Sequence, residues 1–130
     1  MKFLVINDDP GLPNIIKQVQ ADIPLSVIYA SSSREGITLA RQQQPNLILI
    51  SYTLDEMTGI EVCAVIRQFC SAPIFIISAL DDPSTMITAL DAGADDYLVK
   101  PVSARVLEAK IHAAIRRFVT HPLTPYSIPS

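Results

Sequence analysis

The segment P-N-L-I-L-I-S-Y-T-L-D-E-M-T-G, residues 45–59, decides the fold of this chain of 130 residues. Residues 46–51 form a short apolar run that is bounded by turn-forming residues and ends on a small hydroxyl residue, Ser51. Such a run predicts a strand that is buried on both faces, as in a parallel sheet. Open α/β sheets place their ligands and chemistry at the carboxyl ends of such strands. Ser51 is therefore the first candidate for a functional position.

Three other strand-like runs also end on polar side chains. The runs at residues 3–6, 74–77 and 96–99 lead into Asn7-Asp8-Asp9, Ser78 and Lys100, respectively. If these strands are parallel neighbours, all four ends meet at one edge of the sheet. We therefore expect a functional site at that edge, with Ser51 at its centre.

Helix-like spacing of apolar residues recurs between the strands. A further short strand is predicted at residues 25–30, and helices are predicted at about residues 12–21, 33–44, 59–69, 84–92 and 103–118. Five alternating strand–helix units imply a parallel sheet with helices on both faces. We expect one domain over residues 1–119, followed by a Pro-rich tail or linker at residues 120–130.

Composition narrows the possible functions. Apolar residues make up 49% of the chain, which predicts a folded globular domain. The net charge of −3 gives no general attraction to nucleic acid or to an anionic membrane. No apolar run approaches the ~20 residues that span a bilayer, and residue 2 begins a strand directly, so we expect a cytoplasmic protein. Cys63 and Cys70 are expected to be buried or half-buried thiols, because their spacing fits neither a disulfide scaffold nor a metal site.

Six motifs, in order, resemble the receiver domains of two-component response regulators. They are Asn7-Asp8-Asp9, residues 45–54 of the form P-x-L-I-L-x-x-x-x-L, Met57-Thr58-Gly59, Ser78-Ala79, Ala92 to Tyr97, and Lys100-Pro101. The resemblance implies a flavodoxin-like (βα)5 three-layer sandwich with a five-stranded parallel sheet in the order 2-1-3-4-5. It also implies a signal-transduction module of a phosphorelay that is not an enzyme and whose partners are a histidine kinase or an output domain.

The resemblance implies a phosphoryl-transfer site at the edge of the sheet. In the family, an Asp at the end of the third strand attacks phosphorus, and an acidic pair helps to bind Mg²⁺. A hydroxyl and an ammonium group contact the phosphoryl oxygens. By position in the motifs, Ser78 provides the hydroxyl group and Lys100 the ammonium group. Asp8 is the metal-binding acid, and Thr53 offers its backbone carbonyl to the metal. Tyr97 stands at the position of the family's aromatic switch residue.

Two positions depart from the family pattern. Ser51 stands at the position of the phospho-acceptor Asp, and Asn7 replaces the first acid of the pair. A carboxylate is ionised at pH 7, whereas a serine hydroxyl needs a neighbouring base. The two histidines, His112 and His121, do not align near this edge. Because Mg²⁺ favours anionic oxygens, Asp8, aided by Asp9, should bind it only weakly. We therefore expect phosphorylation to fail at the usual position.

Several alternatives remain open at this edge. Asp55 or Glu56 could accept a phosphoryl group instead, although both also suit a solvated turn. Lys100 is expected to form a salt bridge with Asp8, or else to be a simple surface charge. Tyr97 could be a half-buried strand residue with its hydroxyl at the surface. Ser51 could be an engineered replacement of Asp. Asn7 also departs from the pattern, however, and Asp55 stands where the family usually has Pro, so three departures at one edge favour a natural loss.

Three functions follow from these observations. The first is a receiver-like module that acts through protein contacts and pairs as a homodimer through its fourth helix, fifth strand and fifth helix. That surface carries Asp91, Asp95, Asp96, Arg105, Lys110, Arg116 and Arg117, which could also be merely solvated charges. The second is the N-terminal receiver of a longer winged-helix DNA-binding regulator, although nothing in these residues reads DNA. The third, a hydrolase or flavin binder, lacks a Gly-rich phosphate loop and a nucleophile–base pair.

Overall fold

The computed structural model describes the backbone of residues 1–7 and 9–120 and the side chains through residue 117. Its five strands form one parallel sheet in the order β2-β1-β3-β4-β5. The strands are β1 (Lys2–Ile6), β2 (Ser26–Ala30), β3 (Leu47–Ser51), β4 (Ile74–Ser78) and β5 (Asp96–Val99). The helices are α1 (Leu12–Gln20), α2 (Ser33–Gln43), α3 (Gly59–Arg67), α4 (Pro83–Asp91) and α5 (Ala104–Thr120). The predicted flavodoxin-like fold and its strand order are confirmed.

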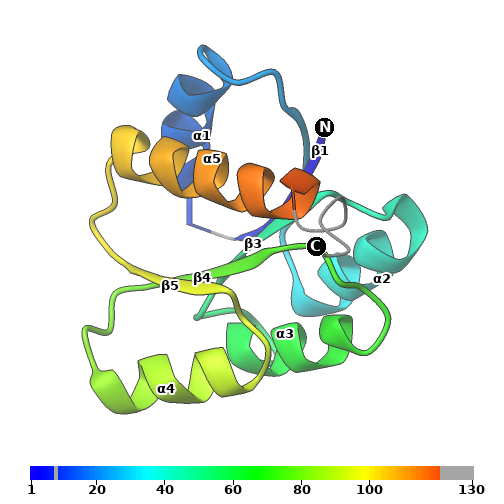
Figure 1. Ribbon diagram of the computed structural model, residues 1–130. Coiled ribbons are helices and arrows are strands. Elements are labelled where there is room, and N and C mark those ends of the chain that lie inside the picture. The colour runs from blue at the N-terminus through cyan, green and yellow to red at the C-terminus, as the bar shows by residue number, and fades with distance from the viewer. Residues whose placement is uncertain (8, 121–130) are drawn as a thin grey trace.

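Helices cover both faces of the sheet. Helices α1 and α5 lie on one face, and α2, α3 and α4 lie on the other (Figure 1). The strands therefore bury alternate side chains in two separate cores. Phe3, Val5, Leu47, Leu49, Phe75 and Ile77 face α1 and α5. Leu4, Ile6, Ile48, Ile50, Ile74 and Ile76 belong to the opposite core.

The central strands β3 and β4 are buried along their whole length. Burial of each Ile or Leu side chain contributes roughly 1.5–3 kcal/mol, so this pair of strands holds the domain together. The register pairs Ile50 with Ile76 and Ser51 with Ile77. Their carboxyl ends are consequently level, and Ser51 and Ser78 lie at the same edge of the sheet.

Side chains cap the amino ends of α2, α3 and α5. Ser32 caps α2, Thr58 forms a capping box with Glu61 at α3, and the Ser103 hydroxyl accepts from Val106 N at the start of α5. Helix α5 runs to Thr120, so the first residue of the predicted tail belongs to the helix. The rest of that tail, residues 121–130, lies outside the described residues, and the predicted domain boundary stays a prediction.

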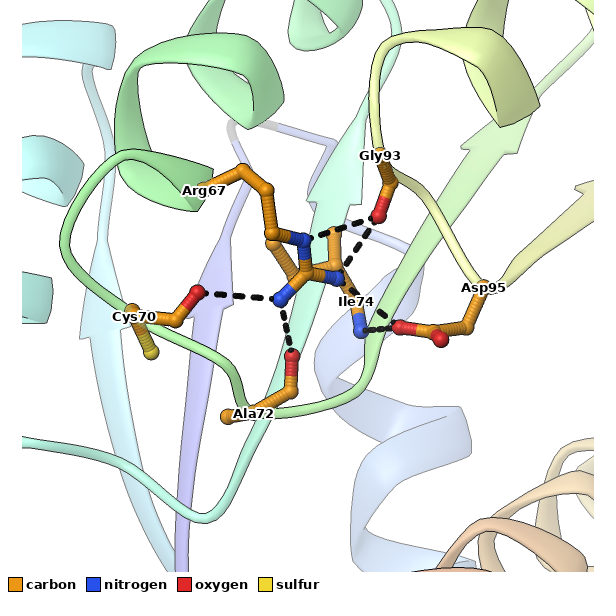
Figure 2. A network of polar contacts seen from close by, with 6 residues as sticks. All are labelled: Arg67, Cys70, Ala72, Ile74, Gly93 and Asp95. Carbon is orange, nitrogen blue, oxygen red and sulfur yellow. Dashed lines mark hydrogen bonds and ion pairs between the residues drawn. The ribbon is translucent and has the colours of Figure 1, made fainter.

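An arginine at the end of α3 forms a hydrogen-bond network at the amino ends of β4 and β5. Arg67 donates to the carbonyls of Cys70, Ala72 and Gly93 and to the Asp95 carboxylate, over 2.7–3.0 Å (Figure 2). Asp95 Oδ2 also accepts from Ile74 N at 2.8 Å. This network joins the end of α3 to the starts of β4 and β5, and the sequence pattern gave no indication of it.

Cys63 is buried and Cys70 half-buried, and both are free thiols, as expected. Burial raises the pKa of the Cys63 thiol to about 11. None of the helices in the described part of the chain is both long and apolar enough to span a membrane.

Candidate functional site

The carboxyl ends of β1, β3, β4 and β5 gather polar side chains at one edge of the sheet. Asn7 follows β1, Ser51 and Ser78 end β3 and β4, and Lys100 follows β5. Ser51 and Ser78 are each 3% exposed and Asn7 is 8% exposed, so polar groups are buried here in an otherwise apolar sheet. Buried polar groups need hydrogen-bond partners. Those partners define what the edge can do.

Ser51 and Asn7 satisfy each other. Ser51 Oγ donates a buried hydrogen bond of 2.6 Å to Asn7 Oδ1. Asn7 Nδ2 in turn donates to the backbone carbonyl of Asp9 at 2.7 Å, which orients the amide with its oxygen toward Ser51. The Ser51 hydroxyl thus donates to a neutral amide oxygen, which cannot serve as a general base. These are the two positions at which we expected the sequence to depart from the family pattern.

Lys100 forms an ion pair across the edge with Asp9. Lys100 Nζ lies 2.7 Å from Asp9 Oδ2, and Gly11 N donates to Asp9 Oδ1 at 2.9 Å. The hydrogen bond from Lys100, followed by that from Gly11, holds the pKa of the Asp9 carboxyl below its usual value. The alternative that Lys100 is a simple surface charge is wrong. Its predicted partner, Asp8, lies outside the described residues, and the partner within them is Asp9.

Ser78 and Tyr97 both contact the backbone of Leu80. Ser78 Oγ accepts from Leu80 N at 3.0 Å, and the Tyr97 hydroxyl donates to Leu80 O at 2.8 Å. Tyr97 is only 6% exposed and packs in the core with Ile76 and Ala89. The alternative of a half-buried Tyr97 with a surface hydroxyl is therefore wrong. Ser78, the predicted phosphoryl contact, and Tyr97, the predicted switch residue, thus hold the same residue of the loop after β4.

The loop between β3 and α3 is attached to the start of α2. Asp55 Oδ1 accepts from Ser33 N at 2.8 Å, a bond that lowers the pKa of the Asp55 carboxyl. Arg34 and Glu56 add an exposed ion pair at 3.5 Å. Asp55, Glu56 and Thr53 are all exposed, as expected of a polar loop. The sequence predicted the turn but not its contact with α2, because nothing in the spacing of residues 33 and 55 pairs them.

Gly59 allows α3 to start directly against the end of β3. A Cβ atom at this position would lie 2.2 Å from the carbonyl oxygen of Ser51. Gly59 N also donates to Tyr52 O at 2.7 Å. This close approach fixes the loop above Ser51, and the M-x-G motif is its signal in the sequence.

The surface of α4, β5 and α5 combines charges with exposed apolar side chains. Asp96 pairs with Lys110 at 2.8 Å and Asp95 with Arg67 at 2.9 Å within the chain. Three of the seven charges assigned to a dimer surface thus already have partners. Ile87, Leu90 and Val106 are 43–58% exposed on α4 and α5.

A doubly wound parallel sheet with hydroxyl, ammonium and carboxylate groups at its carboxyl edge defines a flavodoxin-like domain with a polar site at the strand ends. Residues 3–112 match the family described as "Response regulator receiver domain". The chain belongs to this family. Receiver domains of response regulators are signalling modules that interact with histidine kinases and output domains in two-component systems.

Curated relatives agree with this assignment. The chain is 38% identical over 115 residues to "Transcriptional regulatory protein AfsQ1" of Streptomyces coelicolor, covering 88% of this chain and 51% of that protein. It is 36% identical over 116 residues to "Probable transcriptional regulator ycf27" of Porphyridium aerugineum, covering 89% of this chain and 48% of that protein. The chain thus spans about half the length of the curated relatives it matches.

A solved structure supports the same fold. A two-component response regulator from Clostridium difficile is 28% identical, with a TM-score of 0.85, over 91% of this chain and 98% of that one.

Proposed function

We propose that this receiver domain signals through protein contacts, without phosphorylation at the position where its family carries the phospho-acceptor Asp. Ser51 occupies that position in the motif P-x-L-I-L-x-x-x-x-L. The hydrogen bond from Ser51 Oγ to Asn7 Oδ1 carries the proposal. It gives the hydroxyl a buried, neutral partner, and a serine without a base is a poor nucleophile.

The donor set at the edge fits Mg²⁺ poorly. Hard divalent cations favour carboxylate oxygens, whereas Ser51 and Asn7 are neutral and already bonded to each other. Asp9 is engaged by Lys100 and Gly11. Asp8 and the Thr53 carbonyl remain as ligands for a weak site. In this proposal the Lys100 ammonium takes over part of the charge balance that the metal provides in the family.

The positions of Ser78, Lys100 and Tyr97 support a single conformation of the site. A ligand shifts a conformational equilibrium only through different affinities for the two states. Without a phosphoryl group, Ser78 and Lys100 have no such ligand to contact, and Tyr97 is already buried with its hydroxyl on Leu80. We propose that Tyr97 stays in this inward position and that partners recognise this arrangement.

The partners in this proposal are a histidine kinase, an output domain or a second copy of the chain. The exposed apolar side chains of Ile87, Leu90 and Val106 support a contact surface on α4, β5 and α5. A homodimer through that surface should appear in sedimentation at high protein concentration. Strictly monomeric behaviour in low salt would rule the homodimer out.

A second candidate function is that of N-terminal receiver in a longer DNA-binding regulator. The relatives are named as transcriptional regulators and are about twice as long as this chain, and both facts support this function. The reading frame downstream of residue 130 tests it directly. A winged-helix domain there would support this function, and a stop codon would exclude it.

A matched pair of proteins tests the proposal. NMR spectra are recorded with Mg²⁺ and beryllofluoride, which mimics an acyl phosphate on Asp. We expect no saturable shifts at Ser78 and Lys100 in the natural chain. The double variant Asn7→Asp/Ser51→Asp should gain them, because it restores both carboxylates. Saturable shifts in the natural chain would contradict the proposal.

A further inference from the structure

A cavity of about 410 Å³ lies beside the edge of the sheet, between the start of α1 and the loop from β5 to α5. Its volume is within the range of small-molecule sites in proteins. Five apolar side chains line it: Leu12, Ile15, Ile77, Pro101 and Val102. Leu12 and Ile77 are almost fully buried, whereas Pro101 is exposed. The cavity therefore runs from the core toward the surface.

Asp9 and Lys100 supply the charged part of the lining. Their side chains are 38% and 31% exposed, so the ion pair lies toward solvent and the apolar side chains lie deeper. Apolar walls with a few placed polar groups are typical of ligand sites. Such a lining suits a molecule with an apolar body and one charged end.

The geometry favours an anionic end over a cationic one. Lys100 Nζ carries three N–H donors on a flexible stem, and Asp9 Oδ2 uses one of them. If Lys100 turns toward a ligand, Asp9 keeps its hydrogen bond from Gly11 N. If a cationic ligand displaced Lys100 from Asp9, the ammonium would lose its carboxylate partner, although only 31% of the Lys100 side chain is exposed. Charge complementarity therefore points to a carboxylate.

We propose that this cavity binds a small molecule with an apolar body of one or two rings and a single carboxylate. The rings pack against Leu12, Ile15 and Ile77, and the carboxylate accepts from Lys100. The inference does not depend on whether any residue accepts a phosphoryl group, so it can fail while the proposed function stands.

Methyl NMR of the full chain with 1-naphthylacetate tests the site, with neutral 1-naphthylacetamide as the matched probe. We expect saturable shifts of the Leu12, Ile15, Ile77 and Val102 methyl groups. Because the amide has no negative charge to pair with the Lys100 ammonium, it should bind roughly tenfold more weakly. Equal affinity of acid and amide, or shifts confined to other methyl groups, would overturn the proposal.

Two variants should change the affinity for 1-naphthylacetate in opposite directions. Lys100→Met should weaken binding about tenfold and leave the amide unaffected. Asp9→Asn should strengthen binding of 1-naphthylacetate several-fold, since the Asp9 carboxylate no longer competes for the Lys100 ammonium. If both variants changed the affinity in the same direction, the assigned roles of Lys100 and Asp9 would be contradicted, because a merely structural disturbance weakens binding in both variants.

A filling variant tests the apolar part of the site. Ile15→Phe should abolish binding of both probes, whereas Ile87→Phe, at a position 58% exposed on α4, should not. Methyl spectra show whether each variant is folded, and the Lys100 and Asp9 variants provide an independent test. If inorganic phosphate displaced 1-naphthylacetate at equal concentration, the site would be a general anion site. The proposal that the cavity recognises an apolar body would then be wrong.

Discussion

Ser51 Oγ donates a 2.6 Å hydrogen bond to Asn7 Oδ1, and this bond ties the end of β3 to the residue that follows β1. The two residues are 44 positions apart, and we expected both of them to depart from the family pattern. Each explains the other, because a hydroxyl donor suits an amide acceptor. With the Asn7 amide held in this orientation by its bond to Asp9 O, an Asp at position 51 would instead place a carboxylate against the amide oxygen. The Ser51 hydroxyl and the Asn7 amide thus both have hydrogen-bond partners within the chain.

Ser51→Ala should destabilise the domain. The substitution leaves Asn7 Oδ1 buried without a donor, which costs about 1–3 kcal/mol. Urea unfolding measures the change, with Ser84→Ala, at an exposed position of α4, as the control. Equal stability of the two variants would mean that the Ser51–Asn7 bond contributes little.

Lys100→Met should raise the pKa of Asp9. In the natural chain Lys100 holds this pKa below its usual value of 3.8. A carboxyl group whose pKa is lower in the folded than in the unfolded state stabilises the fold at pH values above its unfolded-state pKa. That stabilisation is lost as the pH falls through its folded-state pKa. The variant should therefore lose less stability than the natural chain between about pH 5 and pH 2. Carboxyl NMR titration measures the pKa directly, and an unchanged Asp9 titration would refute the ion pair.

Gly59→Ala should destabilise the domain even though Ala normally favours helices. A Cβ atom here would lie 2.2 Å from the backbone oxygen of Ser51, so the end of β3 or the start of α3 must move. We expect a loss of about 1–3 kcal/mol. Gly11→Ala is the control, because its Cβ would meet only Asp9 Oδ1, at an ordinary 3.5 Å. Thermal unfolding distinguishes the two, and a stabilised Gly59→Ala variant would contradict the close approach.

Arg67→Met should be among the more damaging single substitutions. It leaves three backbone carbonyls and Asp95 without their guanidinium partner. We expect a loss of about 2–4 kcal/mol in urea unfolding. Arg67→Lys should recover only part of it, because an ammonium cannot reproduce the planar fork. Arg116→Met, at an exposed position of α5, should be nearly neutral. Similar effects of the Arg67 and Arg116 variants would show the network to be weak.

The sequence predicted the fold well because its signals are local. Runs such as residues 46–51 and the helical stripes between them depend on burial that repeats every few residues. The same logic placed Ser51, Ser78 and Lys100 at one edge of the sheet, since parallel strands end on the same side.

The partners of individual side chains were harder to predict. Lys100 contacts Asp9 at a distance of 91 residues in sequence, and Asp55 contacts Ser33 across two loops. Such contacts depend on the exact course of the turns. Arg67 looks like any arginine in the last turn of an exposed helix, and only the tertiary structure reveals the carbonyls around it. The cavity beside Leu12 and Ile77 likewise arises from how α1 and the β5–α5 loop meet.

The most direct test of the central claim is the intact mass of the protein after incubation with acetyl phosphate and Mg²⁺, with peptide mapping of any adduct. We predict no adduct in the natural chain. One phosphoryl group on Asp55 or Glu56, lost under mild base, would leave Ser51 unmodified but would contradict signalling through protein contacts alone, because the chemistry would have moved along the loop. A base-stable adduct on Ser51 would contradict it too, because the hydroxyl would then be a competent nucleophile despite its bond to Asn7.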